Sequence, residues 1–445
     1  MNPTHMNLSI APAFKKRRQQ LIKKMGSGIA IIPTASEKIR NRDASYPFRA
    51  DSYFHYLTGF GEPESVLVLI AGKKPQQILF CRDKDAEREI WDGFRHGPEG
   101  AKKAFGFDAT LSITTLDEQL PQLIADQPAL YFSMGQDAAW DARITAALNQ
   151  VRALSRAGKR PPADIRDVHT PLDQMRLIKD GHEIALMKRA AKISAGAHQR
   201  AMQFAAPGKY EYEVEAELLH EFRRHGSQYP AYTSIVAAGA NACVLHYVDN
   251  DRQIGNNDLI LIDAGCELDG YASDITRTFP ANGKFSGPQR DIYQLVLDSQ
   301  AAAISATRAG SGFLDPHNAA LKVLAQGMLD FKLLRGSLDS VLETESYRQF
   351  YMHRTSHWLG LDVHDAGEYK DGKHWTKLQP GMVLTIEPGC YVRPAKGVPK
   401  AFWNIGVRIE DDALVTAKGC EIITAAAPKT VADIEAVMQS TRSKD

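Results

Sequence analysis

The sequence predicts two domains, a mixed α/β domain over residues 1–172 and a larger α+β domain over residues 173–445. The chain has 445 residues, which is more than one hydrophobic core usually serves. In the first part, short apolar runs alternate with helical patterns, as in mixed α/β domains. From about Thr170 onward, long helical patterns are followed by strands with short turns between them, which favours antiparallel hairpins.

The elements of the first domain follow from short apolar runs. Residues 1–25 predict a surface helix, because no uninterrupted apolar run follows their basic stretch as a signal peptide would require. Residues 152–164 are basic and contain two prolines, which indicates a connector. Buried strands are predicted at residues 29–32, 66–70 and 77–80.

The second domain combines helices with strands. Gly208 and Gly226 follow the first two helical patterns, where glycine is typical of a helix end. The stretch 267–270 has turn character, so the strands on either side of it are expected to pair. Helices are predicted at residues 180–204, 211–225, 290–308 and 317–331, and strands at residues 259–262, 271–279, 382–386 and 405–409.

Composition excludes several classes of protein. The hydrophobic fraction is 44% and the charged fraction 24%, as in ordinary globular proteins. With 54 basic and 53 acidic residues the net charge is +1, so there is no electrostatic signature of nucleic-acid or membrane-surface binding. No apolar run reaches the roughly 20 residues of a membrane span. Five scattered cysteines without a CxxC pair predict free thiols and a cytoplasmic protein.

Four acidic residues each end or interrupt a segment with strong strand character: Asp263, Asp274, Glu387 and Glu410. A carboxylate in such a position is unfavourable unless something pairs with it. Each one alone could be a solvated residue at a turn, but four of them together with His357 make that interpretation poor. Two divalent cations would neutralise their mutual repulsion.

The type of these ligands narrows the choice of metal. Oxygen donors with one imidazole and no thiolate favour Mn²⁺, Co²⁺, Mg²⁺ or Zn²⁺. Arg408 lies two residues before Glu410 in a predicted strand. Because strand side chains alternate, Arg408 is expected beside the acidic cluster.

Five motifs carry a specific resemblance. DAG at 263–265, DITRT at 274–278, HRTSHWLGLDVHD at 353–365, TIEPG at 385–389 and GVRIED at 406–411 resemble the metallopeptidases with the pita-bread fold. That family includes methionine aminopeptidase, prolidase, creatinase and aminopeptidase P. NRDASYPFR at 41–49, FHYLTGF at 54–60 and EPE at 62–64 are similar to its bacterial aminopeptidase P (Xaa-Pro aminopeptidase) branch.

The resemblance implies a pita-bread catalytic domain, preceded by a first domain that restricts access to the site and builds a homo-oligomer (dimer or tetramer). It also implies hydrolysis of the N-terminal Xaa-Pro bond by means of two divalent cations and a bridging hydroxide. The cations are most simply Mn²⁺. The resemblance further implies that Asp263 chelates one cation, His357 and Glu387 hold the other, and Asp274 and Glu410 bridge both.

Further roles follow from the same resemblance. Glu387 is expected to be the general base. His246 and His364 are expected to face the scissile bond, although a histidine among apolar residues is as often a hydrogen-bonded core residue. His353, Trp91 and Tyr391, with Arg408 beside it, are expected on the substrate side of the site. For Trp91, ordinary core packing is an equal alternative.

Rival functions use the same ligands. A prolidase would cut only Xaa-Pro dipeptides, and a related hydrolase would act on organophosphate esters. A metal-free relative could serve as a binding or scaffold protein, but all five ligand positions are filled. The chain departs from its relatives at Arg354, where they commonly carry glycine. Arginine there would be strained if the position needs a positive φ.

Overall fold

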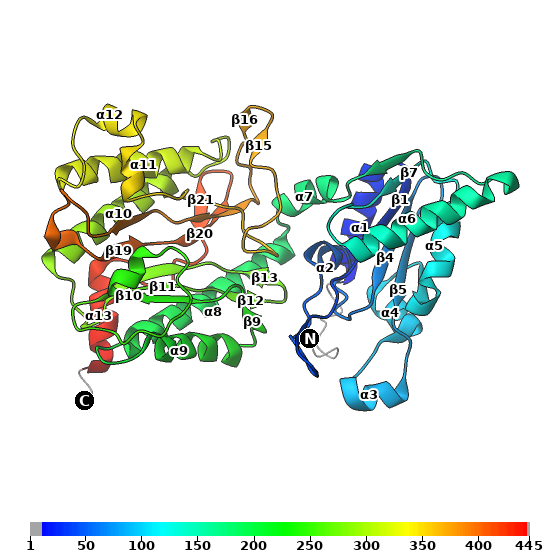
Figure 1. Ribbon diagram of the computed structural model, residues 1–445, viewed down its shortest axis with the longest axis horizontal. Coiled ribbons are helices and arrows are strands. Elements are labelled where there is room, and N and C mark those ends of the chain that lie inside the picture. Colours follow the sequence, from blue (N-terminus) through cyan, green and yellow to red (C-terminus); the bar gives the residue numbers. More distant parts are fainter. Residues whose placement is uncertain (1–10, 443–445) are drawn as a thin grey trace. The chain divides into compact units, whose positions relative to one another are not determined.

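The computed structural model describes residues 11–442, which divide into two compact units between Met175 and Arg176 (Figure 1). No helix among these residues is long and apolar enough to cross a membrane. The helix predicted over residues 1–25 is α1 (Ala11–Met25) in its described part, and the preceding residues lie outside the described range.

Helix α1 is more than the surface helix that was predicted. Its residues Phe14 and Leu21 are buried, and so is Arg18 from the basic stretch. The Arg18 guanidinium donates hydrogen bonds of 3.0 Å to the carbonyl groups of Leu57 and Phe105. Buried arginine is stable only when its donors are satisfied, so these contacts fix α1 to the rest of the first unit.

A six-stranded mixed sheet forms the centre of the first unit, in the order β6-β5-β4-β1-β7-β8. The pairs β5–β6, β1–β7 and β7–β8 are parallel, and β1–β4 and β4–β5 are antiparallel. The three predicted strands are confirmed as β1, β4 and β5. The bounds are β1 (Gly28–Pro33), β4 (Val66–Ala71), β5 (Gln76–Cys81), β6 (Ala109–Ser112), β7 (Ala129–Tyr131) and β8 (Asp164–Arg166).

The rest of the first unit surrounds this sheet. The predicted connector at 152–164 leads into β8 and therefore lies inside the unit. Helix α7 (His169–Leu177) spans the division between the two units. The remaining elements are the hairpin β2 (Ile39–Asn41) and β3 (Ala44–Ser45), and helices α2 (Ser52–Thr58), α3 (Ala86–Asp92), α4 (Gly97–Phe105), α5 (Leu116–Ile124) and α6 (Ala138–Ala153).

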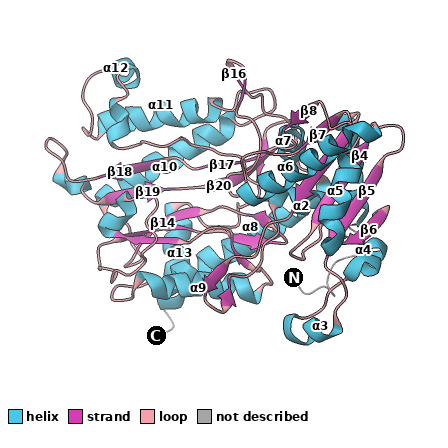
Figure 2. Cartoon of the chain, turned by 45° about the vertical axis from the view of Figure 1, so that its right-hand side comes forward, coloured by secondary structure: helices cyan, strands magenta, loops and turns pink. Residues whose placement is uncertain are grey.

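In the second unit, short antiparallel sheets lie between two pairs of helices, with α10 and α11 on one side and α8 and α9 on the other (Figures 1 and 2). This is the pita-bread arrangement, and the four predicted helices are confirmed. Asp180 and Ser286 cap α8 and α10 through capping boxes. The bounds are α8 (Gly181–Phe204), α9 (Glu211–Arg224), α10 (Gly287–Ala306), α11 (Asp315–Asp330), α12 (Leu338–Glu343) and α13 (Val431–Arg442).

The strands of this unit pair antiparallel throughout. One sheet contains β10 (Ile235–Ala238), β11 (Leu259–Asp263) and β14 (Thr276–Pro280), and a second contains β9 (Tyr229–Pro230), β12 (Cys266–Leu268) and β13 (Tyr271–Ala272). The others are β17 (Val383–Ile386) with β20 (Asp411–Val415) and β21 (Cys420–Ile422), β18 (Gly389–Val392) with β19 (Ile405–Arg408), and the hairpin β15 (Lys370–Asp371) and β16 (His374–Trp375).

The single strand predicted over residues 271–279 is wrong, because the chain passes from one sheet to another between β13 and β14. Asp274 lies in this break. The turn is also shorter than predicted: only Asp269 and Gly270 form it, with φ of 50° and 88°. Gly265 allows the crossing, since a Cβ there would lie 1.7 Å from the Ser273 carbonyl oxygen.

The strand pairing that brings Asp263 and Asp274 together therefore differs from the expected hairpin around residues 267–270. Strand β11 pairs with β14, and Asp263 lies opposite Thr276. Asp274 precedes β14 by two residues, so both aspartates lie at the same end of this sheet.

Candidate metal centre

A pocket of about 770 Å³ opens in the second unit where several strands end. Its lining contains the five predicted metal ligands and four further predicted site residues. They are Asp263, Asp274, His357, Glu387 and Glu410, with His246, His353, His364 and Arg408. Two predicted site residues, Tyr391 and Trp91, are not among the lining residues.

His357 faces the carboxylates through one ring nitrogen. Its Nε2 lies 3.5 Å from Asp274 Oδ2 and 3.6 Å from Glu387 Oε1. Nδ1 lies 3.0 Å from the carbonyl oxygen of Trp358, to which only an N–H can donate. In the neutral ring this leaves the Nε2 lone pair directed at the acidic cluster, as a metal ligand requires. Ligand atoms of Asp274, His357 and Glu410 all lie within 4.8 Å of one another.

Asp263 is held by two donors that fix its carboxylate. Arg408 donates to Oδ2 at 2.6 Å, and the Tyr232 hydroxyl lies 2.6 Å from Oδ1. The same hydroxyl contacts Asp274 Oδ1, so Tyr232 lies between the two aspartates. Tyr232 was not predicted from the sequence, because it lies outside every motif and 31 residues before Asp263.

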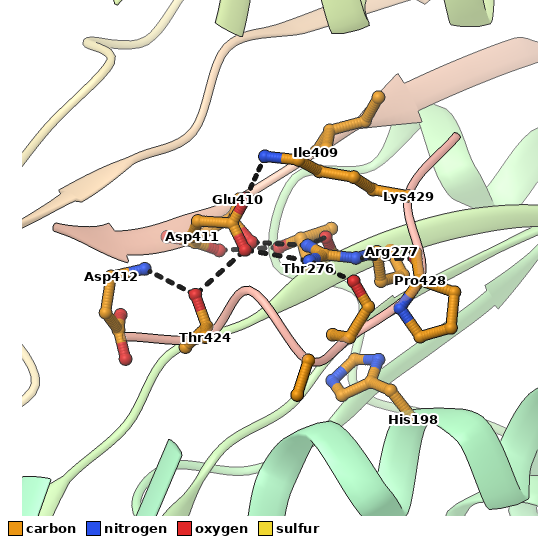
Figure 3. A network of polar contacts seen from close by, with 12 residues as sticks. His198, Thr276, Arg277, Ile409, Glu410, Asp411, Asp412, Thr424, Pro428 and Lys429 are labelled. Atoms are coloured by element: carbon orange, nitrogen blue, oxygen red, sulfur yellow. Dashed lines mark hydrogen bonds and ion pairs between the residues drawn. The ribbon is translucent and has the colours of Figure 1, made fainter. Parts of the chain in front are cut away.

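Glu410 is fixed from behind by a buried polar network (Figure 3). Its Oε2 accepts a hydrogen bond of 2.6 Å from Thr276, and its carbonyl oxygen accepts one of 2.6 Å from Arg277. Arg277 also pairs with Asp411 at 2.7 Å. This network sets the position of the Glu410 backbone, and therefore the point at which its carboxylate enters the pocket.

The site has more negative charge than its own residues neutralise. Burial, together with Asp274 and Glu387, raises the pKa of Glu410 well above its ordinary value. Burial also raises the pKa of Glu387 to about 7, even though His357 and Arg408 oppose this. Four carboxylates face one guanidinium, that of Arg408, and one imidazole. A set of oxygen donors with surplus negative charge and one free ring nitrogen fits hard or borderline divalent cations.

A hydrogen-bonded chain connects Asp263 to the pocket wall. Arg408 donates to the Tyr391 hydroxyl at 3.1 Å, and this hydroxyl lies 2.8 Å from His353 Nε2. His353 Nδ1 lies 2.7 Å from the carbonyl oxygen of Arg354, so Nδ1 carries the proton and Nε2 accepts from Tyr391. Burial and Arg408 lower the pKa of His353 to about 3, so this ring is neutral.

His364 and His246 are exposed and line the pocket, so neither is a buried core histidine. The His364 ring lies 4.2 Å from the ring of His357. The adjacent Asp365 is buried and pairs with Arg176 at 2.6 Å and Lys179 at 2.8 Å. These ion pairs anchor the loop that presents His364.

The structure answers two questions that the sequence left open. Trp91 lies in α3 of the first unit with 80% of its surface exposed, so the core-packing alternative is wrong. Arg354 is absent from the described residues with positive φ, so arginine causes no backbone strain there.

Comparison with known proteins places this geometry in a family. The model of metallopeptidase family M24 matches residues 185–417, which contain all five predicted ligands. The chain belongs to metallopeptidase family M24. The model of the aminopeptidase P N-terminal domain matches residues 14–131 of the first unit.

Relatives within the M24 family match over nearly their full length. The Xaa-Pro aminopeptidase of Escherichia coli (strain K12) is 43% identical over 97% of this chain and 98% of its own. That of Haemophilus influenzae is 44% identical over 96% of both chains. The structure of aminopeptidase PepP from Pseudomonas aeruginosa has a TM-score of 0.96 at 47% identity, covering 97% of this chain and 99% of that one.

Solved structures of the Escherichia coli aminopeptidase P include complexes with substrate and with product. A zinc-substituted aminopeptidase P in complex with product has a TM-score of 0.95 at 42% identity, covering 97% of this chain and 99% of that one. A variant of that enzyme has been solved in complex with substrate, with the same TM-score, identity and coverage. The chain is thus a metallopeptidase with a metal-binding site.

Proposed function

We propose that this M24 enzyme is an aminopeptidase that hydrolyses the first peptide bond of peptides with proline in second position. The observation that carries the proposal is the convergence of four carboxylates and one imidazole on a single pocket. Full-length similarity to two Xaa-Pro aminopeptidases supports the choice of substrate and favours it over prolidase.

Proline explains why such a bond needs a specialised site. An Xaa-Pro bond is a tertiary amide without an N–H, so a peptidase cannot bind it through that donor. When bound, divalent cations polarise a carbonyl group and lower the pKa of water, and neither effect needs the missing N–H.

The residues that would hold two cations are Asp263, Asp274, His357, Glu387 and Glu410. We propose Mn²⁺ as the native metal, with Co²⁺ or Zn²⁺ as alternatives, because oxygen donors dominate the set. Arg408 and Tyr232 hold Asp263, and Thr276 holds Glu410. Asp263 and Glu410 are therefore each fixed by hydrogen bonds of 2.6 Å.

Glu387 is the proposed general base. Its carboxylate accepts a single hydrogen bond among the described residues, from Thr385 at 3.3 Å. Asp263 and Asp274 share the Tyr232 hydroxyl, and Glu410 is buried against Thr276. The group with the fewest competing donors is the one most able to take a proton from water.

His364 and His246, at the exposed side of the pocket, are proposed to bind the scissile carbonyl and the proline side of the peptide. Replacing His364 with alanine is expected to lower kcat by about a hundredfold, because a positioned hydrogen-bond donor to the scissile carbonyl is lost. Melting temperature and metal content should stay unchanged. The matched control is His374→Ala, an exposed histidine in β16 that does not line the pocket. An unchanged kcat would remove His364 from the mechanism.

The substrate assignment is tested by comparing a Xaa-Pro dipeptide with longer Xaa-Pro peptides. Purified enzyme loaded with Mn²⁺ is expected to release the first residue from Ala-Pro-Ala and from Arg-Pro-Pro. Cleavage of Ala-Pro alone would make the enzyme a prolidase. Hydrolysis of an organophosphate ester with no peptide cleavage would support the alternative that the enzyme is an organophosphate hydrolase.

We also propose a cytoplasmic location and a homo-oligomeric enzyme, a dimer or tetramer. All five cysteines have free thiols, which suits a reducing compartment. The exposed Trp91 suits a contact surface on the first unit. Light scattering of the purified protein measures the oligomeric state directly.

A further inference from the structure

One charged side chain of the pocket has no role in the site described above. Arg354 lines the pocket but is exposed, whereas Asp274 and Glu410 are only 4% and 2% exposed. Arg354 therefore lies at the mouth and the acidic cluster lies at the bottom.

The Arg354 guanidinium is held in place without being neutralised. Its Cζ lies 5.1 Å from the centre of the Trp375 ring, and Lys370 Nζ lies 4.4 Å from the centre of the same ring. Such a cation–π contact orients the guanidinium. Within residues 11–442 its nitrogens have no hydrogen bond and no ion pair to a carboxylate. Arg408, in contrast, is already occupied by Asp263 and Tyr391.

The direction in which a peptide enters the pocket determines which part of it lies near the Arg354 guanidinium. If the first peptide bond reacts at the acidic cluster, the residues after proline run outward to the mouth. An extended chain advances about 3.3–3.6 Å per residue, so a short peptide ends near the mouth. A carboxylate there would meet a preoriented, unpaired guanidinium, whose geometry suits bidentate binding.

We propose that Arg354 binds a carboxylate on the departing part of the substrate, either the free C-terminus of a short peptide or an acidic side chain after proline. The inference rests on the proposed function and specifies its substrate preference. The alternative, that Arg354 only offsets the charge of the acidic cluster, gives no discrimination between substrates.

Three peptides separate these cases: Ala-Pro-Ala, its C-terminal amide, and the amide of Ala-Pro-Glu. For the wild-type enzyme we expect KM to be about fivefold lower for the two peptides with a carboxylate in reach, as for a partly exposed ion pair. Raising the ionic strength should shrink this difference.

Arg354→Gln should abolish the preference and leave KM for Ala-Pro-Ala amide unchanged. Lys370→Gln is the matched control, because Lys370 contacts the same tryptophan ring but does not line the pocket. This variant should retain the preference. A preference for the free tripeptide but not for the Ala-Pro-Glu amide would assign Arg354 to the C-terminus alone.

A binding measurement separates failure of this inference from failure of the proposed function. Calorimetric titration with Pro-Ala and with Pro-Ala amide needs no turnover, and Arg354→Gln should weaken binding of the free dipeptide alone. Equal affinity of wild type for both dipeptides, or equal KM for acid and amide peptides, would overturn the role of Arg354. Binding of Pro-Ala without cleavage of any Xaa-Pro peptide would overturn the proposed function instead.

Discussion

Replacing Glu387 with glutamine is expected to lower kcat for an Xaa-Pro peptide by about a thousandfold, which is within the range for loss of a general base. The amide keeps an oxygen that can face a cation but cannot accept a proton from water. Among the residues that the structure describes, the Glu387 carboxylate accepts a hydrogen bond only from Thr385, at 3.3 Å, so little of the fold depends on its charge. Steady-state kinetics and metal analysis of the same preparation measure both effects.

The matched control for this variant is Glu368→Gln, an exposed glutamate outside the pocket. It should retain wild-type kcat and metal content. Wild-type turnover in Glu387→Gln would mean that another group is the base. Loss of bound metal in Glu387→Gln would show that this residue is indispensable as a ligand.

Replacing Asp411 with alanine is expected to lower the free energy of unfolding by about 3–5 kcal/mol, because it leaves a buried charge without its partner. Arg277 and Asp411 are both fully buried and pair at 2.7 Å. Lys429 and Thr424 also donate to Asp411, at 2.7 and 2.8 Å (Figure 3). Urea denaturation measures the loss.

Asp298→Asn provides the comparison, since Asp298 is exposed on α10. It should change the free energy of unfolding by less than about 0.5 kcal/mol. If Asp411→Ala were as stable as Asp298→Asn, the buried pair would contribute nothing to the fold and the network behind Glu410 would need another explanation.

The contribution of Asp411 should also depend on pH. Burial raises the pKa of Asp411, but Arg277 and Lys429 outweigh burial and lower it to about 2. The unfolded value is about 3.9, so folding favours the ionised form, and the stabilisation is complete above that value. It should disappear as pH falls from about 4 towards 2. The stability difference between wild type and Asp411→Ala should therefore shrink over this range, and a constant difference would contradict the assignment.

The sequence predicted the main elements well where apolar patterns were long. Helix α8 was recognisable from its period and from the Pro-Gly pair after it, and β11 from four successive apolar residues. The break between β13 and β14 was not predictable, because residues 271–279 keep strand character while the chain changes sheets. That change depends on the close approach of Gly265 to the Ser273 backbone, a tertiary contact that no periodicity in residues 271–279 reports.

The metal ligands of the site could be predicted from the sequence, but the residues that hold them in place could not. One acidic residue at a strand end could be a solvated turn residue, but four of them together with His357 predicted a common site, and the pocket contains all five. Tyr232 was missed because a tyrosine in a loop has no distinctive pattern. Asp365 lay within a recognised motif, but its ion pairs with Arg176 and Lys179 join segments far apart in the chain.

The most direct test of the account is the amount of metal that the protein binds. After loading with Mn²⁺ and removal of excess ions, elemental analysis of the wild-type protein should give about two ions per chain, as in two-metal hydrolases. The double variant Asp274→Asn, Glu410→Gln should bind far less while circular dichroism shows the same fold. Wild-type protein that retains no more manganese than this variant would contradict the metal centre and the peptidase mechanism that depends on it.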